Sequence, residues 1–179
     1  GLSLLGGQPG RSPVWVPGPP TLAPSMDPPY LIRTERLALR CWEPADAPLL
    51  HEAIVASLPE LREWMPWAHA EPIALAERVE LLREFRGRFD LGQDFVYGIF
   101  APDGSRVLGG TGLHPRSGDG SLEIGYWIRS DSVGCGLATE AAGCLTRVAI
   151  ETCSVDRVEI HVEPGNERSR AIPQRRGFT

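Results

Sequence analysis

Two glycines one residue apart, Gly134 and Gly136, occur in the stretch SVGCGLATEA, which runs directly into a helix-like pattern. Glycine allows a tight turn and lets a ligand approach the main chain closely. Successive N–H groups of such a turn can form a concave anion site, and the start of a helix adds about half a positive charge. The stretch therefore predicts a phosphate site built from backbone. An ordinary strand-to-helix turn would explain the same glycines equally well.

The cationic residues narrow the kind of phosphate site. All 18 cationic side chains are arginines, and the chain contains no lysine. A Walker-type phosphate loop and Schiff-base chemistry both need a lysine, so both are excluded. A dinucleotide site places its glycines after the first strand and continues the pattern with a third glycine. Here the turn comes late and Thr139 occupies the third position, which favours another diphosphate ligand.

The length, the net charge and the cysteines of the chain limit the class of protein to which it can belong. The 179 residues, of which 42% are hydrophobic, predict a globular domain with a proper core. The net charge of -5 and the lack of a basic stripe argue against a nucleic-acid partner. No apolar run is long enough to cross a membrane. The four cysteines form no C-x-x-C pair, so we predict no metal site and expect reduced thiols in a cytoplasmic protein.

The composition divides the chain into two regions. Residues 1–29 are rich in Gly, Pro and Ser without periodicity, and we expect a disordered or loosely attached leader. Residues 30–179 are expected to form one domain. Because the chain stops at RRGFT, where another strand would be expected, we predict that this domain is truncated at its C-terminus.

The pattern after residue 30 is that of an α/β protein with an antiparallel-looking meander. Alternating apolar residues predict strands at 36–42, 94–100, 105–113, 121–128 and 156–162. Helical spacing predicts helices at 44–58, with Asp46 as N-cap, and at 73–89, with an apolar stripe of Leu75, Val79, Leu82 and Phe89. A further helix is expected at 137–150. A last one should start near Ser169 or later, since Pro173 does not fit deep inside a helix. The segment 61–72 is expected to be an aromatic loop.

Four motifs, in this order, resemble the GNAT superfamily of N-acetyltransferases, in the group that acetylates ribosomal-protein N-termini. They are LREWMPWA, LEIGYWI, VGCGLA and PGNERSRAIPQRRGF. The third resembles the family's acetyl-coenzyme A loop, with Val133 at a position that is usually polar. The resemblance implies an α/β (α+β) fold with a mixed, mostly antiparallel sheet flanked by helices, from which the terminal strand is missing.

The resemblance also implies a reaction and its participants. An acetyl group would pass from acetyl-CoA to a primary amine, with a protein N-terminal α-amine as one candidate acceptor. A small amine or an antibiotic is an alternative acceptor, and a non-catalytic coenzyme A-binding module is an alternative function. The protein would be a cytoplasmic monomer or homodimer.

Cofactor contacts are implied for the strand end and the loop. The expected residues are Trp127, Ile128, Arg129, Val133, Gly134, Cys135, Gly136, Leu137, Ala138, Thr139 and Asn166. A backbone N–H near the strand end is expected to stabilise the oxyanion of the transition state. Ser169 is implied as the acid that protonates the leaving thiolate, although it could instead serve only as a helix N-cap.

The acceptor side is the least determined part of the site. Trp64, Met65 and Trp67 are expected to form its wall, with core packing as the alternative. Glu123 is the first candidate for the base that deprotonates the amine, because it lies on the less apolar face of the central strand. A solvated carboxylate is the competing interpretation. His114, His161 and a water relay remain alternatives.

Overall fold

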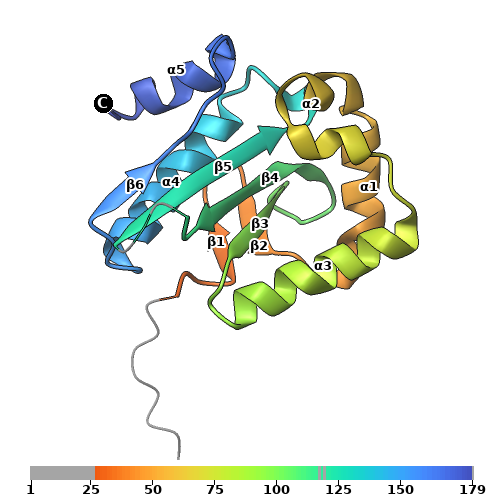
Figure 1. Cartoon of the computed structure of the whole chain (residues 1–179), viewed down its shortest axis with the longest axis horizontal. Coiled ribbons are helices and arrows are strands. Elements are labelled where there is room, and N and C mark those ends of the chain that lie inside the picture. Colours follow the sequence, from red (N-terminus) through yellow and green to blue (C-terminus); the bar gives the residue numbers. More distant parts are fainter. Residues whose placement is uncertain (1–26, 117, 119, 179) are drawn as a thin grey trace, which may run out of the picture.

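A computed structural model describes residues 27–116, 118 and 120–178. Most of the expected leader, residues 1–26, lies outside this part. The described chain forms six strands and five α-helices (Figure 1). The strands are β1 (Leu31–Arg33), β2 (Ala38–Cys41), β3 (Phe95–Phe100), β4 (Val107–His114), β5 (Ser121–Ile128) and β6 (Arg157–Glu159). The helices are α1 (Ala47–Val55), α2 (Leu58–Trp64), α3 (Leu75–Asp90), α4 (Leu137–Glu151) and α5 (Glu167–Arg175).

The six strands lie side by side in the order in which they occur in the chain. Strands β1 to β5 pair antiparallel, as the expected meander requires, and β6 pairs parallel to β5. The β5–β6 ladder joins only residues 121–123 to residues 157–159. Beyond residue 123, therefore, β5 has no strand partner on this edge among the described residues, and the two strands part.

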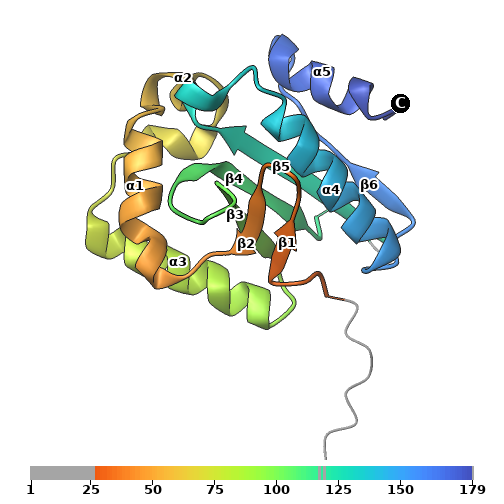
Figure 2. The ribbon, with the colours of Figure 1, turned by 180° about the vertical axis from the view of Figure 1, so that it is seen from behind.

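Helices cover both faces of the sheet. Helix α4 packs on one face, where Ala141 and Leu145 join Leu122 and Ile124 of β5 in one buried cluster. Helices α1 and α3 pack on the other face, where Leu50 and Leu82 join Trp42 and Phe100 in a second cluster (Figure 2). The side chains of β5 alternate between the two faces, as its strand pattern requires, because Tyr126 packs against the first cluster and Trp127 against the second.

Two predictions at the α1 and α3 side hold only in part. Asp46 occupies the N-cap position of α1, as predicted, but its side chain makes no capping bond to that helix; its carboxylate binds Arg40 at 2.6 Å and the Glu43 N–H at 2.9 Å. In α3, the predicted apolar stripe holds for Leu82 and Phe89, but Leu75 is 47% exposed. Arg78 is the third buried residue of this helix, and Glu71 neutralises its charge.

Two further corrections concern segments near the site. The segment expected as an aromatic loop contains the end of α2 and a short 3₁₀ helix, Pro66–Ala70, because Leu61 and Ala68 bury themselves in the second cluster. Helix α5 starts at Glu167, earlier than expected, and contains Pro173 in its interior. Asn166, and not Ser169, is its N-cap.

Candidate active site

The glycine turn has the backbone geometry that its sequence predicts. Gly134 and Gly136 adopt φ of +80° and +79°, in the left-handed region that glycine favours. A Cβ atom at Gly134 would meet no other atom within 4 Å, so its surroundings are open space. No hydrogen bond within the described chain uses the N–H groups of Gly134, Cys135 or Gly136. These N–H groups precede the first turn of α4, and they are available to an anion.

An arginine from the connection between β1 and β2 orients this turn. Arg36 donates from Nη1 to the Cys135 carbonyl oxygen at 2.7 Å and pairs with Glu140 of α4 at 2.6 Å. The N–H and C=O of a trans peptide point in opposite directions. Because the Cys135 carbonyl turns toward Arg36, the Gly136 N–H turns away from it. The role of Arg36 could not be predicted from the sequence, because its partners lie 99 and 104 residues away along the chain.

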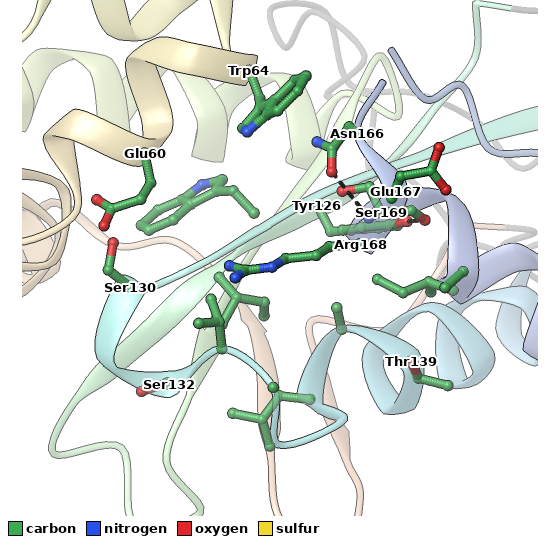
Figure 3. Close-up of a pocket in the computed structure, with 18 of the residues that line it drawn as sticks. Glu60, Trp64, Tyr126, Ser130, Ser132, Thr139, Asn166, Glu167, Arg168 and Ser169 are labelled. Atoms are coloured by element: carbon green, nitrogen blue, oxygen red, sulfur yellow. Dashed lines mark hydrogen bonds between the residues drawn. The ribbon is translucent and has the colours of Figure 1, made fainter. Parts of the chain in front are cut away.

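The turn forms one wall of a cavity of about 890 Å³. Figure 3 shows this cavity bounded by the end of β5, by the turn before α4, and by helices α5 and α2. Of the predicted residues, its walls include Trp64, Met65, Trp127, Ile128, Val133, Gly134, Gly136, Leu137, Ala138, Thr139, Asn166 and Ser169. Tyr126 lines it as well. Sequence reasoning missed two wall residues, Glu60 and Arg168; the latter extends from α5 across the opening in Figure 3.

The edge of β5 decides which N–H groups can face a ligand. The Arg129 N–H donates to the Leu108 carbonyl oxygen at 2.8 Å, on the β4 side. Along an antiparallel strand the N–H groups alternate between the two edges. The Trp127 N–H therefore also faces β4, whereas those of Tyr126 and Ile128 face the gap toward β6. The N–H groups of Trp127 and Arg129 are therefore not available to a ligand, whereas those of Ile128, an expected contact, and Tyr126 are.

Arg129 is further removed from the cavity by its side chain. The guanidinium donates to Glu52 of α1 at 2.6 Å and to Asp131 at 3.0 Å. These bonds raise the pKa of Arg129, with Glu52 as the largest cause, and lower the pKa of Glu52. Arg129 is 7% exposed and does not line the cavity. It ties the end of β5 to α1 and so holds the strand end in place. Cys135 likewise lies outside the cavity wall, because its side chain points to solvent.

The buried polar atoms fit a polar ligand. Ser130 lines the cavity, and its buried Oγ has no hydrogen-bond partner in the described chain. A buried hydroxyl without a partner is costly unless a ligand or water satisfies it. Together with the free N–H groups of the turn, this hydroxyl fits a phosphate-bearing cofactor.

The start of α5 closes the cavity on a third side. Asn166 accepts a hydrogen bond on Oδ1 from the Ser169 N–H at 3.1 Å. The Tyr126 hydroxyl donates to the Ser169 carbonyl oxygen at 3.0 Å, and burial raises the pKa of Tyr126 to about 12. The Ser169 side chain is half-buried and lines the cavity. Asn166 thus positions Ser169, as the N-cap of the helix that carries it.

A second cavity, of about 880 Å³, lies on the other side of the β5 end. Among the predicted residues it includes Trp67, Glu123, His114 and His161. The two cavities share Trp64, Met65, Tyr126, Trp127, Asn166 and Ser169. The rings of Trp67 and Trp127 lie 6.1 Å apart in a tilted arrangement. Trp64, Met65 and Trp67, the predicted acceptor wall, therefore all line this second cavity.

The candidate bases differ in their surroundings. Glu123 is half-buried, 3.9 Å from Arg116, and pairs in register with His114. His114 bonds Asp94 through Nδ1 at 2.5 Å, and both side chains are mostly enclosed. Burial opposes the charge on Asp94, but His114, Arg116 and Arg88 outweigh it and lower the pKa of this carboxyl. His161 is exposed and bonds Glu159, which raises the pKa of His161. Sequence reasoning missed Asp94, which lies 20 residues before its partner.

Comparison with known proteins agrees with this geometry. The model of the acetyltransferase (GNAT) domain family matches residues 36–179. The chain is 33% identical over 145 residues to YdaF of Bacillus subtilis (strain 168), a protein named as a ribosomal N-acetyltransferase; the match covers 80% of this chain and 78% of YdaF.

Solved structures show the same fold. A crystal structure of an acetyltransferase is 30% identical, with a TM-score of 0.74, covering 83% of this chain and 82% of that chain. RimL, a ribosomal L7/L12 α-N-protein acetyltransferase solved with coenzyme A, is 20% identical, with a TM-score of 0.75, covering 83% of this chain and 84% of RimL. The expected mixed, mostly antiparallel α/β fold is confirmed. The chain belongs to the GNAT acetyltransferase family, and it is an acetyl-CoA-dependent N-acetyltransferase.

Proposed function

We propose that this protein acetylates the α-amino group of a protein N-terminus; its relative YdaF is named as a ribosomal N-acetyltransferase. The observation that supports this most directly is the meeting of two cavities at Tyr126 and Trp127. One cavity has the free N–H groups suited to a cofactor. The other opens to the surface and is large enough to admit the end of a peptide chain.

The cofactor side would hold acetyl-CoA by its phosphates and its arm. When bound, acetyl-CoA supplies the activated acetyl group. The N–H groups of Gly134 and Gly136, with the positive end of α4, suit the pyrophosphate. The Tyr126 and Ile128 N–H groups at the open edge of β5 suit the arm and the developing oxyanion. Val133, Leu137, Ala138 and Thr139 shape the wall around them.

The acceptor side would hold the amine. Trp64, Met65 and Trp67 offer apolar surface for the first side chain of the peptide. Glu123 and Glu163 line the same cavity, and their carboxylates attract a cationic ammonium group. A base must remove one proton from that ammonium before it can attack. Ser169, where the cavities meet, is the proposed proton donor to the leaving thiolate.

An acceptor screen tests this proposal. The full chain is incubated with acetyl-CoA and peptides that begin with Ala, Ser or Met, and thiol release is followed. Mass spectrometry then locates the acetyl group. Matched peptides with a blocked N-terminus and one internal lysine should not react.

Three results would contradict the proposal. Turnover only with small amines would favour the small-molecule alternative. Acetylation of the internal lysine would exclude an α-amine preference. Coenzyme A binding without turnover of any amine would support a non-catalytic module.

Several expectations stay predictions. Among the described residues, no helix is long and apolar enough to cross a membrane. The cytoplasmic location, the lack of a nucleic-acid partner and the choice between monomer and homodimer remain proposals, as does the division of the chain into leader and domain.

A further inference from the structure

The second cavity, which we call the acceptor cavity, contains the imidazole of His114. Neighbouring residues fix the position of this ring. His114 is the last residue of β4, and its ring lies on a part of the sheet that has no side chains. A Cβ at Gly112 would lie 2.6 Å from His114 Nε2, and one at Gly125 would lie 3.6 Å from it. Gly112 and Gly125 face each other in the β4–β5 register. The absence of a side chain at both positions leaves room for the His114 ring. A Cβ atom at Gly112 would overlap this ring, so only glycine fits at that position.

Asp94 determines which nitrogen can act as a base. The carboxylate lies 2.5 Å from Nδ1, so the neutral imidazole carries its proton on Nδ1 and donates it to Asp94. Nε2 then carries the lone pair. In the described chain no protein group bonds Nε2, and it is not enclosed as an unsatisfied buried atom. Nε2 is available to a molecule in the acceptor cavity.

The charged neighbours of His114 are of both signs. From other elements, the charged or titratable groups that line this cavity are Glu71 before α3, Arg78 and Arg88 of α3, Glu123 of β5, Arg116 after β4, and His161 and Glu163 after β6. Glu123, the first candidate from the sequence, lies 3.9 Å from Arg116 and is, after Glu159, the next cause that raises the pKa of His161. Among the described residues no group holds the Glu123 carboxylate through a short hydrogen bond, whereas Asp94 holds the His114 ring in this way.

We propose that His114 is the general base for the amine, that Asp94 and Gly112 position it, and that Glu123 attracts the ammonium without accepting its proton. This assignment rests on the amine acetylation proposed above, whichever amine is the acceptor. His114 Nε2 takes one proton from the ammonium, and the electron pair of the broken N–H bond stays on nitrogen. The products are an imidazolium paired with Asp94 and a neutral amine ready to attack.

The test compares His114→Gln, Asp94→Asn and Gly112→Ala with Glu123→Gln as the matched control. A base can accept a proton only in its unprotonated form, so kcat/KM of the wild type should rise with pH to a plateau. His114→Gln should lower kcat about 100-fold or more and remove this rise. Asp94→Asn and Gly112→Ala should lower kcat about tenfold or more, while Kd for coenzyme A stays within about twofold. Glu123→Gln should raise KM and keep the rise.

Chemical rescue by imidazole and NMR spectroscopy distinguish His114 from Glu123 as the base. Added imidazole should restore activity to His114→Gly but not to Glu123→Gln. In the wild type above neutral pH, long-range nitrogen NMR should show His114 with its proton on Nδ1. A proton on Nε2, a wild-type pH profile in His114→Gln, or loss of the profile in Glu123→Gln would each overturn the assignment. Reaction of a small amine but no peptide would contradict the proposed acceptor and still permit every one of these measurements.

Discussion

The Tyr126 hydroxyl donates a hydrogen bond to the Ser169 carbonyl oxygen across 3.0 Å. In an uninterrupted helix, that carbonyl would accept from the N–H of residue 173. Residue 173 is proline, which has no N–H. Pro173 therefore leaves the carbonyl unpaired within α5, and Tyr126 of β5 pairs with it. This bond joins β5 to α5 where the two cavities meet.

Replacing Tyr126 with phenylalanine should loosen α5. The change removes one hydrogen bond, worth about 1 kcal/mol, and leaves the Ser169 carbonyl half-buried without a partner. We expect Kd for coenzyme A to rise about threefold to tenfold, measured by calorimetry. Faster hydrogen exchange confined to 167–175 should accompany it. Unchanged exchange there would show that the bond does not hold the helix.

The same substitution tests the pKa of Tyr126. Burial raises this pKa to about 12, above the ordinary tyrosine value of about 10. The folded protein thus keeps the proton more tightly than the unfolded chain. The stability from this group is complete below about pH 10 and is lost as the pH rises toward 12. Denaturant unfolding between these values should show a steeper loss for the wild type than for Tyr126→Phe. Parallel curves would contradict the burial of this hydroxyl.

A methyl group at Gly134 should obstruct the cofactor directly. Gly134 has a positive φ and open space around it, so alanine adds backbone strain of about 1 kcal/mol and a methyl group at the cavity wall. We expect Kd for coenzyme A to rise about tenfold or more, which equals about 1.4 kcal/mol. Gly104→Ala is a matched control, since it has φ of +75° and no atom within 4 Å but does not line the cavity. Equal losses of affinity in both variants would assign the effect to strain alone.

Removing Arg36 should weaken cofactor binding from a distance. Arg36→Ala loses the bond to the Cys135 carbonyl and the pair with Glu140, so the glycine turn becomes free to change its orientation. Because Arg36 is largely exposed, we expect a rise in Kd for coenzyme A of only about threefold to tenfold. Arg33→Ala, which also loses a bond to a carbonyl, that of Pro102, should leave this Kd unchanged.

The buried pair beneath the acceptor cavity should matter chiefly for stability. Arg78 and Glu71 are almost fully enclosed and joined at 2.8 Å. Arg78→Met leaves the Glu71 charge uncompensated and should cost about 3–5 kcal/mol of unfolding free energy. The double variant Arg78→Met, Glu71→Gln should recover part of it, because no charge then remains buried. Arg83→Met, on the exposed face of α3, should change stability by less than about 0.5 kcal/mol. Chemical denaturation measures all three.

The sequence by itself determined the features that depend on local spacing. The alternation of β5 placed Tyr126 and Trp127 on opposite faces, and the two glycines before α4 required a left-handed turn. The motif order was enough to indicate the family. These signals depend on a residue and its near neighbours, so they can be read without the fold.

Tertiary structure alone decided the contacts between distant segments. Arg36 holds the Cys135 carbonyl, Asp94 orients His114, and Tyr126 replaces the hydrogen bond that Pro173 cannot make. It also decided that Arg129 faces Glu52 and not the cofactor cavity. Each contact joins residues from separate elements, whose distance depends on how the sheet and helices pack. No spacing along the chain specifies that distance.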